Sequence, residues 1–244
     1  MIELNKIYQG DCLEVMKDIP DKSIDAIITD PPYGTTACKW DSVIPFEPMW
    51  KQLNRVIKDN GAICLFGSEP FSSYLRMSNI KNYKYDWIWI KSHPTGMYSA
   101  KYIPMKYHEI ISVFNKHNYY PIMTVGKMHH NKKGFHGKSE HYNNKPTFYK
   151  THNDNKKYPK SYLYFNSVNR VNNYHSTQKP VDLIEYLIKT YTLENETVLD
   201  FTIGSGTTAV ACINTNRNFI GIEKEQKYVD ISNERINNIE KKLF

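Results

Sequence analysis

The sequence predicts an α/β fold, a mostly parallel sheet with helices on both faces, because strand-like and helix-like segments alternate along most of the 244 residues. Two apolar runs also end directly in loops that carry chemically active side chains, the first at Asp30 and the second at Asp200. Open α/β sheets bind their ligands beyond the carboxyl ends of their strands. The sequence therefore predicts one ligand site shared by these two strand ends.

The first half of the chain supplies the elements around Asp30. Apolar residues recur near the helical period over 46–57, and Gly61 is expected to end that helix and open the next strand. Short apolar or aromatic runs indicate strands. The expected elements are strands over 6–10, 24–28, 62–66, 87–90 and 110–114, and helices over 13–18, 46–57 and 71–77.

The second half repeats the alternation around Asp200. Leu183, Ile184, Leu187, Ile188 and Tyr191 form one apolar face, which predicts a helix that begins just after Pro180. The elements expected after residue 175 are helices over 181–191, 207–213 and 226–243, and strands over 197–200 and 217–223. Together the two halves predict a seven-stranded sheet with one antiparallel strand.

The loop Asp30-Pro31-Pro32-Tyr33-Gly34 follows the strand over 24–28. The prolines fix φ and lack N–H groups, so the loop is stiff and its carbonyls are free to accept hydrogen bonds from elsewhere. Asp30 and the Pro31 carbonyl suit the two N–H groups of an amine on a flat heterocycle, and Tyr33 suits stacking on its ring. A proline-stiffened turn with a solvated Asp and a packing Tyr remains the alternative.

A Gly-rich turn, Phe201 to Gly206, follows the strand that ends at Asp200, and the next strand ends on Glu223. A strand, a G-x-G turn, a helix and an acidic residue after the next strand form a nucleotide-binding unit. A bare G-x-G does not identify the cofactor. Near the N-terminus, Asp11 is placed either to cap the following helix or to contact a nucleotide base.

Positive charge is concentrated in residues 116–175, which hold eleven Lys and Arg against two Asp and Glu, whereas the remaining residues hold 21 against 23. Loops of this length in compact domains are usually functional. Lysines that alternate with tyrosines suit the phosphates and bases of nucleic acid. The candidate nucleic-acid-binding residues are Lys127, Lys132, Lys133, Lys138, Lys145, Lys156 and Lys157.

Four widely spaced cysteines, Cys12, Cys38, Cys64 and Cys212, match neither a zinc pattern nor a redox pair, so we expect free and mostly buried thiols. Five histidines, His129, His130, His136, His141 and His152, lack Cys or acidic companions at ligand spacing, and we expect no metal. No apolar stretch approaches the ~20 residues that span a bilayer. We expect a cytoplasmic protein without a membrane partner.

These motifs resemble the amino-group (N6-adenine and N4-cytosine) DNA methyltransferases in the β arrangement, where D-P-P-Y precedes the Gly-rich motif. A third segment, Thr177-Gln178-Lys179-Pro180, is similar to the one that holds the methionine end of the family's cofactor. The resemblance covers roughly residues 4–114 and 175–240. Phe201-Thr202 replaces the commoner Pro-Phe, and Ser176 replaces Pro. A Rossmann-like S-adenosylmethionine-dependent methyltransferase sheet is implied.

The resemblance implies S-adenosylmethionine as cofactor, no metal, and a catalytic half over 1–115, a target-recognition insert over 116–175 and a cofactor half over 176–244. Acidic residues also suit a sulfonium cation better than the pyrophosphate of NAD. The implied catalytic residues are Asp30, Pro31, Pro32 and Tyr33. The implied cofactor-binding residues are Asp11, Cys12, Asp30, Lys179, Asp200, Phe201, Gly204, Ser205, Gly206, Thr207, Thr208 and Glu223.

The implied reaction is methyl transfer to N6 of adenine in duplex DNA after the base flips out of the stack. Asp30 favours adenine, because the N4-cytosine enzymes usually carry Ser at that position. N4-cytosine methylation, RNA methylation and a non-catalytic DNA-binding module are the alternatives. Family members of this arrangement are often homodimers.

Overall fold

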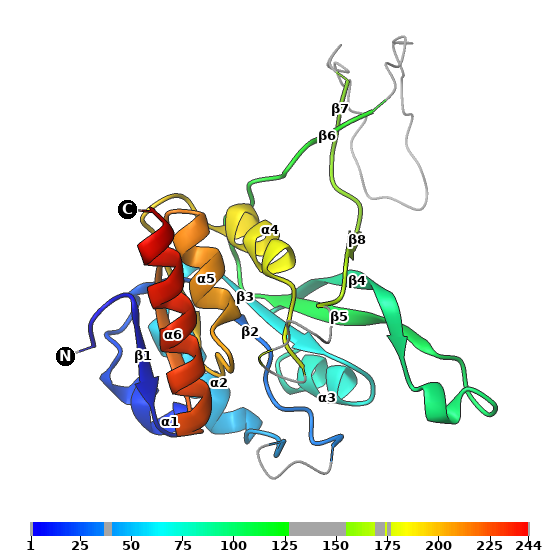
Figure 1. Ribbon diagram of the computed structural model, residues 1–244, viewed down its shortest axis with the longest axis horizontal. Helices are drawn as coiled ribbons and strands as arrows, with labels where there is room; N and C mark the ends of the chain where they lie inside the picture. The colour runs from blue at the N-terminus through cyan, green and yellow to red at the C-terminus, as the bar shows by residue number, and fades with distance from the viewer. Residues whose placement is uncertain (1, 37–40, 127–154, 169–173, 175–176, 244) are drawn as a thin grey trace. The chain divides into compact units, whose positions relative to one another are not determined.

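The computed structural model describes residues 2–36, 41–126, 155–168, 174 and 177–243 (Figure 1). The chain divides into two compact units. The first combines residues 1–120 with 161–244, and the second spans residues 121–160.

The first unit is built on an eight-stranded sheet with the order β1-β10-β9-β2-β3-β5-β4-β8. Every neighbouring pair is parallel except the two made by β5, so β5 is the one antiparallel strand of this sheet. The strands are β1 (Lys6–Gln9), β2 (Ile24–Thr29), β3 (Ile57–Gly67), β4 (Tyr83–Thr95), β5 (Lys106–Phe114), β8 (Tyr162–Phe165), β9 (Thr197–Asp200) and β10 (Asn218–Glu223). The predicted α/β class and single antiparallel strand are confirmed.

The prediction of seven strands is wrong. Residues 162–165 fall within the predicted basic insert, whereas the structure forms β8 from them, an eighth strand beside β4. Leu163 of β8 is buried in the core of the first unit. β8 has only four residues, so its alternation of apolar and polar side chains is too short to predict a strand within a Tyr- and Asn-rich segment.

The boundary between α2 (Phe46–Val56) and β3 also differs from the prediction. The helix ends at Val56, and the strand begins at Ile57 rather than after Gly61. Ile57 pairs with Ile24, and the register then shifts before Ala62 pairs with Ala26. Gly61 lies inside this irregularity, where an added Cβ would meet the Asp25 carbonyl oxygen at 2.6 Å. The glycine therefore permits a close backbone approach instead of ending the helix.

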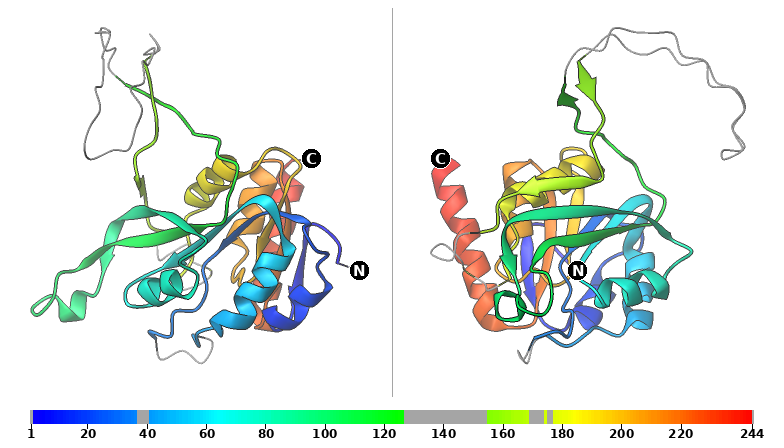
Figure 2. Two further views of the ribbon diagram at one scale, coloured as in Figure 1. Left: turned by 180° about the vertical axis from the view of Figure 1, so that it is seen from behind. Right: turned by 90° about the vertical axis from the view of Figure 1, so that its right-hand side faces the viewer.

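Helices cover both faces of the sheet, as predicted (Figure 2). On one face, α4 (Val181–Tyr191), α5 (Thr207–Asn214) and α6 (Gln226–Leu243) bury Leu183, Leu187, Ala209 and Ile236. On the other face, α1 (Cys12–Val15), the 3-10 turn η1 (Met16–Asp18), α2 and α3 (Phe71–Ser78) bury Met16, Met49, Leu53 and Leu75. The apolar face of each helix thus packs against the sheet, as its sequence period predicted.

The second unit is described only at its two ends. There, β6 (Thr124–Val125) pairs antiparallel with β7 (Lys156–Lys157). All four strand residues are exposed. This ladder is too short to bury an apolar core by itself.

Three cysteines, Cys12, Cys64 and Cys212, are free and buried, as expected, and Cys38 lies outside the described residues. Burial raises the pKa of the Cys12 thiol to about 12, so it stays a neutral thiol. No described helix is long and apolar enough to cross a membrane. Within the described ranges no His, Cys, Asp and Glu cluster could hold a metal ion, and the five insert histidines fall outside those ranges.

Candidate active site

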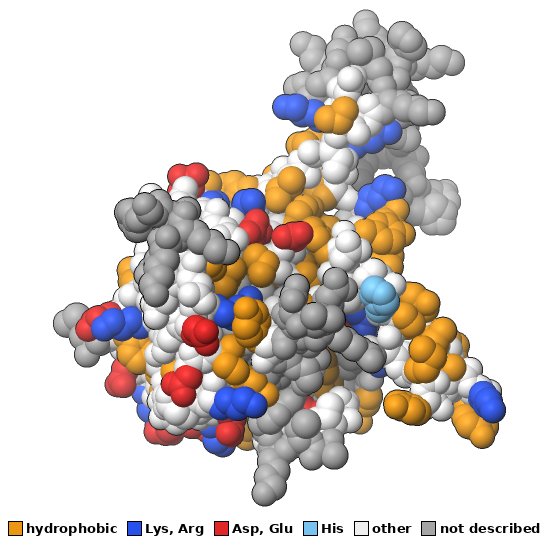
Figure 3. All heavy atoms as spheres, in the orientation of Figure 1, with side chains coloured by type: hydrophobic (Ala, Val, Ile, Leu, Met, Phe, Trp, Pro, Cys, Tyr) orange, Lys and Arg blue, Asp and Glu red, His pale blue; other side chains and the backbone are white. Residues whose placement is uncertain are grey.

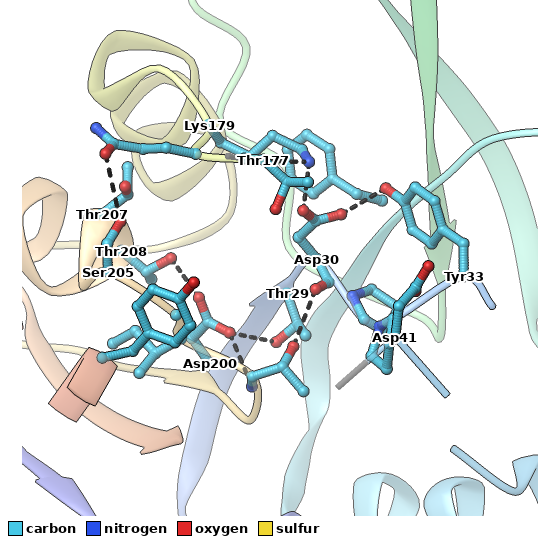
Figure 4. A pocket seen from close by; sticks show the side chains of 18 of the residues that line it. Thr29, Asp30, Tyr33, Asp41, Thr177, Lys179, Asp200, Ser205, Thr207 and Thr208 are labelled. Carbon is cyan, nitrogen blue, oxygen red and sulfur yellow. Dashed lines mark hydrogen bonds and ion pairs between the residues drawn. The ribbon is translucent and has the colours of Figure 1, made fainter. Parts of the chain in front are cut away.

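The two predicted loops meet at the carboxyl ends of the neighbouring strands β2 and β9 (Figure 4). The Asp200 carboxylate accepts hydrogen bonds from the hydroxyls of Thr29, at 3.1 Å, and Thr208, at 2.6 Å. The Thr202 hydroxyl donates to the Asp30 carbonyl oxygen at 3.0 Å. These bonds fix the D-P-P-Y loop against the Gly-rich turn, so Asp200 has a structural role at the junction.

A cavity of about 820 Å³ opens above this junction. It is lined by all four D-P-P-Y residues and by every predicted cofactor-binding residue except Gly206. Its walls also bring in α1, the T-Q-K-P segment and the ends of β4 and β5, which lie far apart in the sequence. The walls hold seven carboxylates against three lysines, and this excess of negative charge suits a cationic ligand.

Two glycines shape the turn between β9 and α5. Gly204 has φ +54°, and nothing lies within 4 Å of the place that its Cβ would take. Gly206, the N-cap of α5, has φ +79°, and its Cβ would meet Ser232 at 2.9 Å. Gly206 therefore serves the packing of the turn on α6, whereas Gly204 leaves the cavity wall open and bare.

Asp11 and Glu223, from the ends of the neighbouring strands β1 and β10, supply two further carboxylates to the cavity. The Asp11 side chain caps α1 by accepting from the Leu13 N–H at 2.9 Å, which confirms the capping alternative. Glu223 accepts from the backbone N–H groups of Gly204 and Glu225, each at 2.9 Å. Each carboxylate keeps further lone pairs for ligand hydroxyl or amino groups.

The D-P-P-Y end of the cavity holds a buried charge cluster of Asp30, Lys91, Glu109 and Lys179. Lys179 forms an ion pair with Asp30, and its Nζ lies 3.4 Å from Glu109. Lys91 contacts the other oxygen of Glu109 at 3.2 Å. Two positive and two negative groups thus neutralise one another in a site where unpaired charge would be costly.

Burial and neighbours pull the pKa values of this cluster in different directions. Burial raises the pKa of the Asp30 carboxyl, although Lys179 opposes the rise. Burial also disfavours ionisation of Glu109, but Lys179 and Lys91 outweigh it and lower its pKa. The pKa of Lys179 is raised, because Asp30 and Glu109 overcome its burial. Lys179 therefore stays protonated, and Asp30 is the member that most readily accepts a proton.

Tyr33 lies beside this cluster. Its ring stacks on Phe71 of α3, with centroids 5.0 Å apart and planes 28° from parallel. Its hydroxyl donates a hydrogen bond to Asp30. Burial and the nearby carboxylates raise the Tyr33 pKa well above its usual value, so the phenol remains a donor.

Asp41 holds the segment that follows the D-P-P-Y loop. Its carboxylate accepts from the backbone N–H groups of Gly34, Thr35 and Thr36 at 2.7–2.9 Å. A hydrogen bond from the Thr36 side chain, together with these three backbone bonds, outweighs the effect of burial and lowers the Asp41 pKa. The loop is thus closed by an ionised side chain that lies seven residues beyond Gly34.

Sequence reasoning missed Lys91, Glu109 and Asp41 as members of the site. Glu109 pairs in register with Trp89 on β4, and that register becomes visible only in the folded sheet. The sequence did carry a signal for these two residues, because Lys91 directly follows one predicted apolar strand and Glu109 directly precedes another. For Asp41, the signal was an acidic residue shortly after the Gly34-Thr35-Thr36 turn, whose backbone N–H groups need acceptors.

Two of the predicted DNA-binding residues, Lys156 and Lys157, lie exposed on β7 of the second unit. Lys127, Lys132, Lys133, Lys138 and Lys145 lie outside the described residues.

The fold and the site define a nucleotide-cofactor enzyme of the α/β class, with an acidic cavity lined by the D-P-P-Y loop. A family profile described as DNA methylase, covering the N6 and N4 enzymes, matches residues 24–234. The chain therefore belongs to the amino-group DNA methyltransferase family, whose cofactor is S-adenosylmethionine.

Individual relatives agree with this membership. The chain is 32% identical to the type II methyltransferase M1.MboII of Moraxella bovis, over 98% of this chain and 99% of that protein. It is 30% identical to the type II methyltransferase M.BglII of Bacillus subtilis, over 94% of this chain and 68% of that protein.

Solved structures share the architecture. The M1.HpyAVI–SAM complex is 28% identical, with a TM-score of 0.63 over 94% of this chain and 98% of that one. The cytosine-N4-specific PvuII DNA methyltransferase reaches a TM-score of 0.65 at 16% identity, over 96% and 90% of the two chains, and shows likeness of fold alone.

Proposed function

We propose that this enzyme transfers a methyl group from S-adenosylmethionine to N6 of adenine in duplex DNA, after the base has flipped into the cavity. The observation that carries the proposal is the position of Asp30 and Tyr33 in the same cavity as Asp200 and the Gly-rich turn. An amine bound at the loop would lie next to a cofactor bound at the turn. Such a geometry suits direct, in-line transfer between two bound ligands.

The cavity fits the cofactor by charge and by shape. Its carboxylate excess suits a sulfonium cation, and Gly204 leaves one wall open to a nucleoside. We propose that Glu223 binds the ribose hydroxyls and Asp11 the adenine amine. Cys12, Phe201, Ser205, Thr207 and Thr208 would line the remaining surface, with Gly206 supporting the turn from outside it. Bound S-adenosylmethionine supplies an electrophilic methyl group.

The protein's contribution to the chemical step centres on Asp30. Its carboxylate accepts one N–H of the target amine, and the Pro31 carbonyl accepts the other, which favours a more tetrahedral and nucleophilic nitrogen. Stiffness from Pro31 and Pro32 fixes these acceptors before the base arrives. As the nitrogen gains the methyl group it becomes acidic, and one of its protons passes to an Asp30 carboxylate oxygen.

Lys179 and Tyr33 prepare this acceptor. Both donate to Asp30, one to each carboxylate oxygen, and each oxygen retains a lone pair for the incoming amine. One face of the Tyr33 ring packs on Phe71, and we propose that the other face stacks on the flipped base.

The remaining predictions concern the wider protein. We propose that the basic insert over 116–175 recognises the target and that its lysines, including Lys156 and Lys157, contact DNA phosphates. The halves over 1–115 and 176–244 then supply the catalytic and cofactor functions of one domain. We also propose a cytoplasmic location and a homodimer.

Nucleoside mass spectrometry of methylation-free DNA, incubated with the protein and S-adenosylmethionine, tests the reaction. Wild-type protein should form N6-methyladenine, and Asp30→Ala should form none while still binding the cofactor. Asp86→Ala is the matched control, because Asp86 is a partly buried carboxylate outside the cavity. Sequencing of the modified DNA would then give the recognition site.

Other products would overturn parts of the proposal. N4-methylcytosine would keep the mechanism and overturn the base assignment. Methylation of structured RNA in preference to duplex DNA would overturn the substrate. Measurable cofactor and DNA binding with no modified base in either would favour a non-catalytic module.

A further inference from the structure

The hairpin that joins β4 to β5 carries an exposed cluster that the reaction chemistry does not use. We call residues 92–108 the arm. It projects beyond the rest of the sheet in two opposite views (Figures 1 and 2). Met97, Tyr98, Tyr102 and Ile103 at its tip are all more than half exposed, and Tyr98 is completely exposed. Apolar side chains gathered in this way mark an interaction surface.

The arm has an ordered backbone that presents these side chains. Gly96 adopts φ +87° and starts the 3-10 turn η2 (Met97–Ser99). The Ser99 carbonyl then accepts from the N–H groups of Tyr102, at 2.9 Å, and Ile103, at 3.0 Å. The exposed rings are therefore held on a preformed turn, which lowers the entropy cost of binding.

The charge of the arm indicates the kind of partner. Residues 92–108 contain two lysines, Lys101 and Lys106, and two histidines, but no acidic residue. Three tyrosines lie among these basic groups. In Figure 3, positively charged side-chain surface lies beside apolar surface at the projecting end of the arm. Rings between positive charges suit bases and phosphates better than they suit a protein surface.

One side of the arm, from its base to Met97 at the tip, lines the catalytic cavity. His93, Pro94, Thr95 and Met97 line that cavity together with Asp30 and Tyr33. A base bound in the cavity would therefore lie close to the arm, and so would the duplex that it leaves. A flipped base leaves an unstacked gap, and proteins that distort a duplex often insert apolar wedges between base steps.

We propose that the arm is a DNA-binding element that packs Tyr98 and Tyr102 against the bases beside the flipped nucleotide, with Lys101 on the adjacent phosphate. This inference rests on the proposed DNA substrate and adds a contact in the first unit to those proposed for the basic insert. The arm holds the opened duplex while the target base occupies the cavity.

Duplex binding, measured by fluorescence anisotropy with S-adenosylhomocysteine present, tests this role. Tyr98→Ala/Tyr102→Ala should weaken binding at least tenfold, because each lost base–aromatic stack is costly. Tyr98→Phe/Tyr102→Phe should bind like wild type, because the rings remain. Lys101→Gln should reduce the salt slope of log K by about one. Leu193→Ala truncates an exposed apolar side chain that precedes the amino end of β9 and lies outside the cavity, and it should change nothing.

Unchanged duplex affinity in the double alanine variant, with cofactor affinity and melting temperature retained, would overturn the role of the arm. Loss of affinity in the phenylalanine variant would also overturn it, since stacking needs no hydroxyl. The proposed function fails separately, when wild-type protein binds duplex DNA without forming N6-methyladenine. In that case the binding assay still tests the arm.

Discussion

Removing the charge of Glu109 should destabilise the protein more than removing Glu109 and Lys91 together. In Glu109→Gln, Lys91 and Lys179 share only Asp30, so the buried cluster carries one uncompensated positive charge. At an effective dielectric constant of about 20, charges 3.2–3.4 Å apart attract by about 5 kcal/mol each. Part of that is returned when Glu109 no longer has to be desolvated, which leaves a net cost of about 3–5 kcal/mol.

Lys91→Met leaves the opposite imbalance, and the double variant restores neutrality with the Lys179–Asp30 pair intact. We expect the double variant to recover at least half of the loss, and Lys91→Met alone is also costly, so the interaction energy in a double-mutant cycle should exceed about 2 kcal/mol. Urea unfolding followed by the fluorescence of the buried tryptophans measures each free energy of unfolding.

The Glu185–Lys189 pair on α4 is the matched control, because it is an ion pair at 3.5 Å with an exposed lysine. Its cycle should give about 0.5 kcal/mol or less. The reasoning about the buried cluster is refuted if the costs of Glu109→Gln and Lys91→Met are additive, that is, if their interaction energy is as small as that of the control pair.

Three further predictions concern the turn and the loops. Gly204→Ala should cost about 1 kcal/mol for its left-handed φ, and Gly206→Ala should cost more, because its Cβ also meets Ser232; thermal unfolding of the two variants compares them directly. Asp41→Ala leaves three backbone N–H groups without their acceptor and should lower kcat/KM at least tenfold with little change in cofactor affinity, measured by methyl-transfer kinetics and calorimetry. Burial raises the Asp200 pKa to about 7, so the folded state keeps a proton that the unfolded state loses above about pH 4. The free energy of unfolding should fall between about pH 4 and pH 7, by at most about 4 kcal/mol, and Asp200→Asn should flatten that slope; parallel curves would contradict it.

The sequence was most informative where one strand or helix carried the whole signal. The ends of β2 and β9 were placed correctly, because an apolar run followed by an unusual loop needs no knowledge of pairing. Their meeting in one cavity follows from parallel strands that share a carboxyl edge.

Features that depend on pairing between distant segments escaped sequence reasoning. Glu109 is a site residue because β5 runs antiparallel between β3 and β4, which turns its side chain toward Lys179. The eighth strand, β8, forms only because residues 162–165 pair with the free edge of β4. Such contacts are set by register, which a single strand's composition does not specify.

The way in which the second unit joins the first has a consequence for how this enzyme can evolve. The chain leaves the first unit at Tyr120, whose N–H bonds the Thr190 carbonyl oxygen at 2.8 Å, and returns at Ser161, whose carbonyl oxygen accepts from Ile88 at 2.9 Å. Both ends are thus fixed within the main fold. Loop-closure entropy grows slowly, so even doubling the 40 residues between them costs only about 0.6 kcal/mol. The segment can be lengthened or exchanged as a cassette, and, given the recognition role proposed for the insert, a lineage could change its DNA site without rebuilding its catalytic core.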